Sequence, residues 1–153
     1  MTPSTQQRIY AAGLALVSLL AALIPFVLRP VCGAMPDGRY MSCHYSGILV
    51  TVLYALLVLW ALLLVFLPRQ RILALLLDLY CIVASLAALL IPRRIVPVHY
   101  DQSHLFGLCK KLAMPCHQTF GLLLPISIIL ILVALLHLIK LALDGRQGRK
   151  FPA

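Results

Sequence analysis

Apolar residues run along this chain in four long stretches, each closed off by arginine, proline or aspartate. A helix that crosses a bilayer needs about 20 mostly apolar residues. The stretches that reach this length cover about residues 10–28, 46–67, 72–91 and 120–143. Lipid admits only helices and closed barrels, because every backbone group must find its partner within the protein. Four leucine-rich runs of this length therefore predict four transmembrane helices.

The connections between these stretches are unequal in length. Residues 68–71 alone join the second stretch to the third, whereas residues 29–45 and 92–119 form much longer loops. With an even number of spans, both long loops lie on one side of the membrane. The two termini and the short connection then lie on the other side.

Both long loops carry the same motif, a cysteine followed after a spacer by Met-x-Cys-His-x-Ser/Thr. The motif residues are Cys32, Met41, Cys43, His44 and Ser46 in the first loop and Cys109, Met114, Cys116, His117 and Thr119 in the second. Such duplication indicates two equivalent hairpins related by an axis along the membrane normal. We therefore expect an all-α membrane protein of two parallel helical-hairpin repeats, about residues 10–67 and 72–143, with irregular outer loops. Residues 1–153 form one domain, and 144–153 form a short basic tail.

Composition supports this architecture and excludes other classes. Apolar residues make up 63% of the chain and charged residues 11%, and the mean hydropathy is +1.02. Soluble domains average about 45–50% apolar residues and about 25% charged residues. A soluble globule, a disordered chain and a secreted disulfide miniprotein are thereby excluded. The net charge of +9 favours anionic lipid headgroups as partners, and no nucleic-acid-binding motif accompanies it. The first stretch is too long for a signal peptide and lacks a cleavage site.

The basic residues do not by themselves orient the chain in the membrane. Seven lie on the side of the termini and six in the long loops, so the positive-inside rule gives no answer. Four loop cysteines suit an oxidising compartment, and a tight arginine-bearing turn and a basic tail are typical of cytoplasmic flanks. We therefore expect both termini to be cytoplasmic.

The repeated motif has a physical logic of its own. Ser46 and Thr119 are suited to cap helices, which would place Cys43 and Cys116 close to helix N-termini. A helix N-terminus favours the thiolate form, and a neighbouring protonated histidine adds to this effect. The sequence thus predicts two activated thiols in equivalent positions.

Structural disulfides are one interpretation of the loop cysteines. The pairs Cys32–Cys43 and Cys109–Cys116 would each close a short loop, with a stabilisation of roughly 2–3 kcal/mol. Four cysteines allow three pairings, so bridges between the two hairpins remain open.

Metal or haem binding is a second interpretation. Thioether, thiolate and imidazole groups suit copper, zinc or iron. The ligands offered by the repeat are Met41, Cys43, His44, Met114, Cys116 and His117. If the repeat axis brings the two helix starts together, these residues converge on one symmetric site. If the cysteines are bridged, methionine and histidine remain for copper or a haem.

Thiol–disulfide exchange is a third interpretation. Four spans with a cysteine pair in each outer loop resemble the bacterial disulfide-bond formation proteins of the B type. That resemblance implies electron transfer from Cys32/Cys43 and Cys109/Cys116 to a membrane quinone. Neither pair has the C-x-x-C spacing of that family's reactive pair, which puts the catalytic role in doubt.

Several polar residues fall inside the predicted spans, where they are costly and often functional. Asp78, Cys81 and Ser85 share one face of the third span, at spacings of three and four. His137 and Lys140 lie in the fourth span. Counted from the same membrane surface, Asp78 and His137 lie at similar depth, so we expect them to pair directly or through Lys140. Such a pair either fixes helix packing or relays a proton or ion.

The cysteine motif after spans one and three also resembles an uncharacterised family of small bacterial membrane proteins, classed as a domain of unknown function. The resemblance covers nearly the whole chain, from the segment around Cys32 to both Met-x-Cys-His motifs. Members are encoded beside ABC permeases of the macrolide-exporter kind, iron-uptake components and thioredoxin-like proteins. It implies an accessory subunit in the bacterial inner membrane that handles iron, copper or haem with such a permease or thioredoxin-like partner. A quinone-linked oxidoreductase and a purely structural scaffold are the alternatives.

Overall fold

Four membrane-length helices dominate the computed structural model, which describes residues 3–33, 38, 40–67, 71–101, 104–109 and 114–150. In chain order its elements are α1 (Pro3–Leu23), a π-helical turn η1 (Ile24–Leu28), α2 (Ser42–Phe66), α3 (Arg71–Leu90), β1 (His99–Asp101), β2 (His104–Leu105) and α4 (Pro115–Lys150). Four helices are long and apolar enough to cross a membrane, which confirms the prediction. The small antiparallel pair β1–β2 was not predicted.

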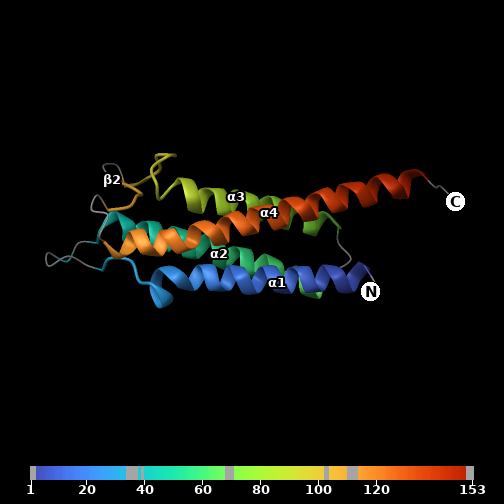
Figure 1. Cartoon of the computed structure of the whole chain (residues 1–153), viewed down its shortest axis with the longest axis horizontal. Helices are drawn as coiled ribbons and strands as arrows, with labels where there is room; N and C mark the ends of the chain where they lie inside the picture. The colour runs from blue at the N-terminus through green and yellow to red at the C-terminus, as the bar shows by residue number, and fades with distance from the viewer. Residues whose placement is uncertain are drawn as a thin grey trace.

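The helices lie side by side along one long axis (Figure 1). α1 packs mainly against α2, and α3 mainly against α4, which confirms two helical hairpins. The β1–β2 pair and the start of α4 lie at one end of the bundle, and both chain termini at the other. We call the end that contains Cys32 and Cys109 the cysteine end, and the opposite end the terminal end.

The faces of the helices divide as a membrane bundle requires. Small side chains such as Ala11, Ala61 and Ala134 are buried between helices, where they let the backbones approach closely. Large apolar side chains such as Leu59 and Leu136 point outward and are more than half exposed. An exposed apolar surface of this kind suits lipid.

Both outgoing helices begin earlier than the apolar pattern predicts. α2 starts at Ser42 and α4 at Pro115, so each Met-x-Cys-His motif forms the first helical turn instead of the loop before it. The first turns match: the His44 N–H donates to the Met41 carbonyl at 2.9 Å and the His117 N–H to the Met114 carbonyl at 3.1 Å. Hydropathy misses these turns because their residues are polar or small.

The predicted capping roles of Ser46 and Thr119 are wrong for the same reason. Both residues lie inside their helices, where their hydroxyls donate to the carbonyls four residues earlier, Ser42 and Pro115, each at 3.1 Å. The placement of Cys43 and Cys116 next to helix N-termini is nevertheless confirmed, since each is the second residue of its helix.

The π-helical turn η1 carries the chain from α1 into the first long loop. Pro25 has no backbone N–H, so the helical hydrogen bonding shifts, and the Arg29 N–H donates to the Ile24 carbonyl at 2.9 Å. The Val31 N–H then donates to the Pro25 carbonyl, also at 2.9 Å. Gly47 of α2 lies against this segment, because a Cβ atom there would be 3.2 Å from Val31 Cγ2. This close approach fixes the position of Cys32.

Candidate metal centre

Four cysteines, two from each repeat, meet at the cysteine end of the bundle. The Sγ atoms of Cys32, Cys43, Cys109 and Cys116 all lie within 4.8 Å of one another. Each long loop supplies one thiol, and the first turn of each outgoing helix supplies another. Two of the contacts between them cross the repeats, since Cys109 Sγ lies 3.2 Å from Cys43 Sγ and 3.9 Å from Cys32 Sγ. We call these residues the four-cysteine cluster.

Reciprocal hydrogen bonds hold each loop to the helix of the other repeat. The Gly107 N–H, two residues before Cys109, donates to Ser46 Oγ of α2 at 2.9 Å. Thr119 Oγ of α4 donates at 2.8 Å to the carbonyl of Arg29, in the loop that leads to Cys32. The equivalent Ser and Thr of the repeated motif therefore position the cysteine loop of the opposite hairpin.

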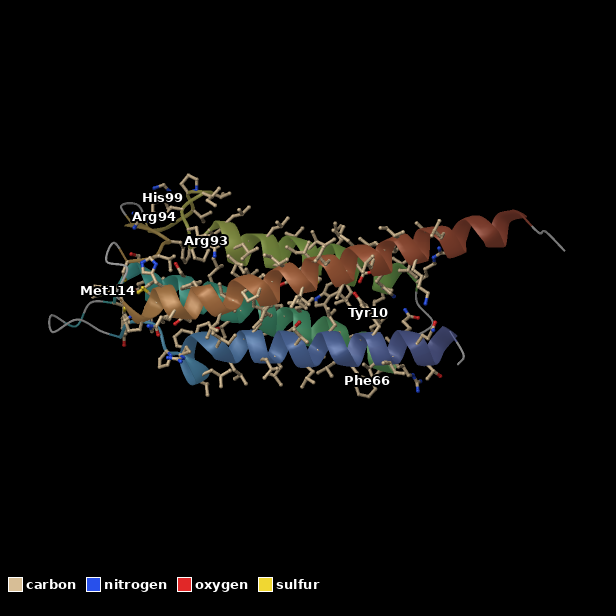
Figure 2. All side chains as sticks on the ribbon, in the orientation of Figure 1. Tyr10, Phe66, Arg93, Arg94, His99 and Met114 are labelled. Atoms are coloured by element: carbon tan, nitrogen blue, oxygen red, sulfur yellow. The ribbon has the colours of Figure 1, made fainter. Side chains whose placement is uncertain are left out.

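The other motif residues surround the cluster unequally. Met41 Sδ lies 3.8 Å from Cys109 Sγ, at the edge of the cluster. Met114 lies at the same end of the bundle (Figure 2) and packs, partly buried, against the core. Of the predicted metal ligands, Cys43 and Cys116 are therefore brought together, with Met41 next to them.

The two motif histidines do not enter the cluster. His117 Nε2 lies 2.8 Å from the Cys109 carbonyl oxygen and is hydrogen-bonded there. The ring of His44 stacks on Tyr40 with 4.3 Å between centroids and meets Phe26 edge-on. In their place the structure adds Cys32 and Cys109, which the sequence offered only as disulfide or redox partners.

Exposure differs within the cluster. Cys43 and Cys116 are fully buried, whereas Cys32 and Cys109 are partly exposed. Burial by itself raises the pKa of the Cys32 thiol, but hydrogen bonds from Cys43 and Cys109 outweigh it and hold that pKa below the ordinary value. Burial, together with hydrogen bonds to Cys43 and Cys116, raises the pKa of the Cys109 thiol far above the ordinary value of a cysteine. Cys32 is thus the loop thiol that ionises more readily.

The geometry suits one tetrahedral ion. A zinc ion with bonds of about 2.3 Å to four thiolates holds their sulfur atoms about 3.8 Å apart. The Sγ–Sγ distances of 3.2 Å and 3.9 Å, and the 4.8 Å limit for the whole set, lie on either side of that value. Zinc and iron both accept four thiolates in a tetrahedron. A haem iron takes only one or two protein ligands, so the cluster fits a single ion better than a haem.

All five cysteines are free thiols in the structure. The sulfur atoms of the pairs Cys32–Cys43 and Cys109–Cys116 lie within 4.8 Å, and so do those of the pairs between the repeats. The disulfide pairing stays a prediction. Cys81 belongs to another place in the bundle, where its thiol donates to the Leu130 carbonyl at 3.8 Å.

Of the polar residues predicted inside the spans, Asp78, His137 and Lys140 lie toward the terminal end, whereas Cys81 and Ser85 lie farther along α3. Asp78 Oδ2 lies 2.7 Å from His137 Nδ1, so the two residues pair directly, as their depth indicated. Lys140 takes no part in that pair and donates to Gln6 Oε1 at 2.9 Å. Ser85 is fully buried and its hydroxyl has no hydrogen-bond partner among the described residues.

Comparison with known protein families identifies the family of this chain. A family described as a domain of unknown function, DUF4418, matches residues 14–141. The matched range contains all four clustered cysteines and both Met-x-Cys-His motifs. No curated protein and no solved structure matches the chain.

Proposed function

The chain belongs to the DUF4418 family, a domain of unknown function, and we propose that it is a multi-pass membrane protein that binds a thiophilic metal ion. The ion is held by Cys32, Cys43, Cys109 and Cys116 and is passed to or from a transport partner in the same membrane. The observation that carries this proposal is the convergence of four Sγ atoms, two from each repeat, within 4.8 Å.

Helix electrostatics support thiolate ligation at this place. A site of four thiolates and one divalent ion has a net charge of −2. Cys43 and Cys116 are the second residues of α2 and α4, so the positive ends of two helix dipoles face the cluster. These dipoles offset part of the negative charge that four thiolates bring into a buried site.

The pattern of exposure favours handling of the ion over a purely structural role. The fully buried thiols of Cys43 and Cys116 anchor the ion from the helices. The partly exposed thiols of Cys32 and Cys109 can be exchanged one at a time for the ligands of an incoming or departing carrier. Four cysteines are also a usual ligand set of structural zinc sites, so the exposure of Cys32 and Cys109 is the feature that favours exchange of the ion.

The cellular setting belongs to the same proposal. We place the cysteine end outside and both termini in the cytoplasm of a bacterial inner membrane, with zinc, iron or copper as the ion. The partner we expect is an ABC-type permease, for which this chain would be an accessory subunit. The apolar, lipid-compatible faces of four membrane-length helices support residence beside such a permease.

The test is the metal content of the full-length protein purified in detergent under reducing conditions. We expect about one zinc or iron ion per chain, and cobalt substitution should give the intense sulfur-to-cobalt absorption of a tetrathiolate site. Cys43→Ser and Cys116→Ser should each lose most of the metal. Cys81→Ser is the matched control and should keep it, because Cys81 contacts Leu130 and not the cluster. A reduced wild-type protein that binds no metal would refute the proposal.

Thiol–disulfide exchange is the second candidate, favoured by one contact and one pKa. Cys109 Sγ and Cys43 Sγ are 3.2 Å apart, and the lowered pKa of Cys32 makes it the most reactive loop thiol. Oxidation of two thiols to one disulfide would release two electrons and two protons to an acceptor, a membrane quinone in the simplest case.

Counting free thiols separates the two candidates. Membranes quenched with acid straight from cells are alkylated, and the mass of the chain is measured. Five free thiols, with metal in the same preparation, support metal binding. A single free thiol at Cys81 means that the four loop and helix cysteines are bridged, which supports the redox candidate and excludes tetrathiolate ligation.

A further inference from the structure

A second polar cluster lies toward the terminal end of the bundle, away from the cysteines. At its centre is Asp78 of α3, which is fully buried. Tyr10 of α1 donates its hydroxyl to Asp78 Oδ1 at 2.7 Å, and His137 of α4 bonds Oδ2 through Nδ1 at 2.7 Å. The rings of Tyr10 and His137 stack with 3.9 Å between centroids and 15° between planes. Three helices from both repeats thus meet at one carboxylate.

The charges around Asp78 are few and can be followed helix by helix. α3 adds Cys81 one turn away and, toward the terminal end, Arg71, which donates to the Leu141 carbonyl. α4 adds Lys140, whose Nζ is bonded to Gln6. The terminal half of α2 contributes only apolar buried side chains, namely Leu57, Ala61 and Leu64. α1 adds Arg8, which is exposed. Among the described residues, His137 is the one basic side chain that touches the carboxylate.

A pocket on the side of the chain termini connects this cluster with solvent. It has a volume of about 420 Å³, and its polar lining comes from Gln6, Gln7, Tyr10, His137 and Lys140. A cavity of this size and polarity accommodates several water molecules. The His137 side chain is 14% exposed. Nδ1 of its ring is hydrogen-bonded to Asp78. No hydrogen-bond partner of Nε2 is found among the described residues. Figure 2 shows Tyr10 in the half of the bundle toward the terminal end.

We propose that Asp78, His137 and Tyr10 form a proton-binding site that exchanges one proton with water on the side of the chain termini. The proton adds to Nε2 of a neutral His137 whose Nδ1–H already donates to Asp78, and it leaves from the same atom. Asp78 stays ionised and balances the imidazolium, and Tyr10 keeps its hydrogen bond to the carboxylate. The Nε2–H bond forms as an O–H bond of a hydronium ion breaks, the reverse step returns the proton to water, and nothing is oxidised or reduced.

The placement of the site gives the proton a mechanical effect. A neutral imidazole makes an ordinary hydrogen bond to a carboxylate, whereas an imidazolium makes a charge-assisted bond that is roughly twice as strong. Asp78 and His137 both belong to the second hairpin, so protonation strengthens the contact between α3 and α4. The hydrogen bond and the ring stacking of Tyr10 link this pair to α1 of the first hairpin, so the site couples pH on the terminal side to the packing around these three helices. It does not depend on the metal proposed for the cysteine end.

The experiment is a pH titration of the full-length protein in lipid nanodiscs, with ¹⁵N-labelled histidine followed by NMR. The chain has five histidines, so His137→Gln assigns the signal. We expect the His137 ring to titrate, with the proton on Nδ1 in its neutral form. Asp78→Asn should move the midpoint to lower pH by about one unit or more, since a neighbouring negative charge is lost.

A second variant is expected to shift the His137 midpoint in the opposite direction, which a general loss of folding would not do. Tyr10→Phe removes a donor from the carboxylate, which concentrates its negative charge and should move the His137 midpoint to higher pH. Asp101→Asn, in β1 at the cysteine end, is the matched control and should leave the midpoint unchanged. Thermal unfolding of the variants in detergent would show whether the bundle is folded, and this control does not depend on metal at the cysteine end. A His137 ring that does not titrate between about pH 5 and 9, or a midpoint that ignores both substitutions, would overturn the inference.

Discussion

His44 and His117 occupy equivalent positions in the two copies of the motif but make different contacts. His117 Nε2 bonds the carbonyl of Cys109 at 2.8 Å and so fixes the backbone that carries one proposed ligand. His44 stacks on Tyr40, away from the sulfur atoms. At the scale of single residues, the two copies of the motif share the same histidine, but the two histidines have different structural roles.

This difference predicts unequal effects of two matched substitutions. His117→Ala should weaken metal binding about tenfold, because groups that orient ligands commonly contribute that much or more to affinity. His44→Ala should change the affinity less than twofold. Competition with a chromogenic chelator measures both dissociation constants, and equal losses in the two variants would contradict the assigned roles.

Residue types alone reveal part of the site. The duplicated motif marks Cys43, Cys116 and their neighbours, and the spacing of Asp78 and His137 indicates their pairing. The motif does not show that Cys32 and Cys109 join the same cluster. That convergence depends on how two hairpins dock, which is a property of packed surfaces and not of either loop.

At the scale of elements, the first turns of α2 and α4 and the segment from η1 to Val31 place the thiols. The apolar pattern finds the helix bodies but starts α2 and α4 too late, because Cys43 and His44 carry no periodic apolar signal. The pattern also passes over β1 and β2, whose five residues are too few for alternation to register. Gly47 is a point of close approach between α2 and the η1 segment.

Gly47→Val tests the importance of that approach. A Cβ atom at this position would lie 3.2 Å from Val31 Cγ2 and 3.4 Å from Phe26 and Pro25. We expect overpacking to cost about 1–3 kcal/mol, to displace Cys32 and to reduce metal affinity.

Gly121→Val is the matched control for that substitution. Gly121 lies two residues after Thr119, whereas Gly47 directly follows Ser46, and a Cβ atom at Gly121 has no neighbour within 4 Å. This variant should keep both its thermal stability and its metal. Thermal unfolding in detergent and metal content are the measurements, and a Gly47→Val protein as stable as Gly121→Val would argue against a tight contact.

At the scale of the whole molecule, the protein is two hairpins that complete one site between them. Each hairpin supplies two thiols and, through Ser46 or Thr119, positions the loop of the other. Two thiols bind a soft ion far more weakly than four. Neither half should therefore retain the metal alone.

Splitting the chain between α2 and α3 tests this view. Residues 68–70 separate the hairpins, so the two halves can be expressed from separate genes, together or singly. Together they should copurify and bind about one ion per pair. A single half that binds the ion as tightly as the intact chain would contradict a shared site.

The reciprocal hydrogen bonds from Ser46 to Gly107 and from Thr119 to Arg29 have a consequence for ancestry. If the repeat arose by duplication of one hairpin, the ancestral hairpin had half a site and could bind its ion fully only as a homodimer. Capture of the ion and assembly of two subunits were then a single, concentration-dependent event. Fusion into one chain made the site independent of concentration, and it allowed the two halves to diverge. The unequal histidines show such divergence.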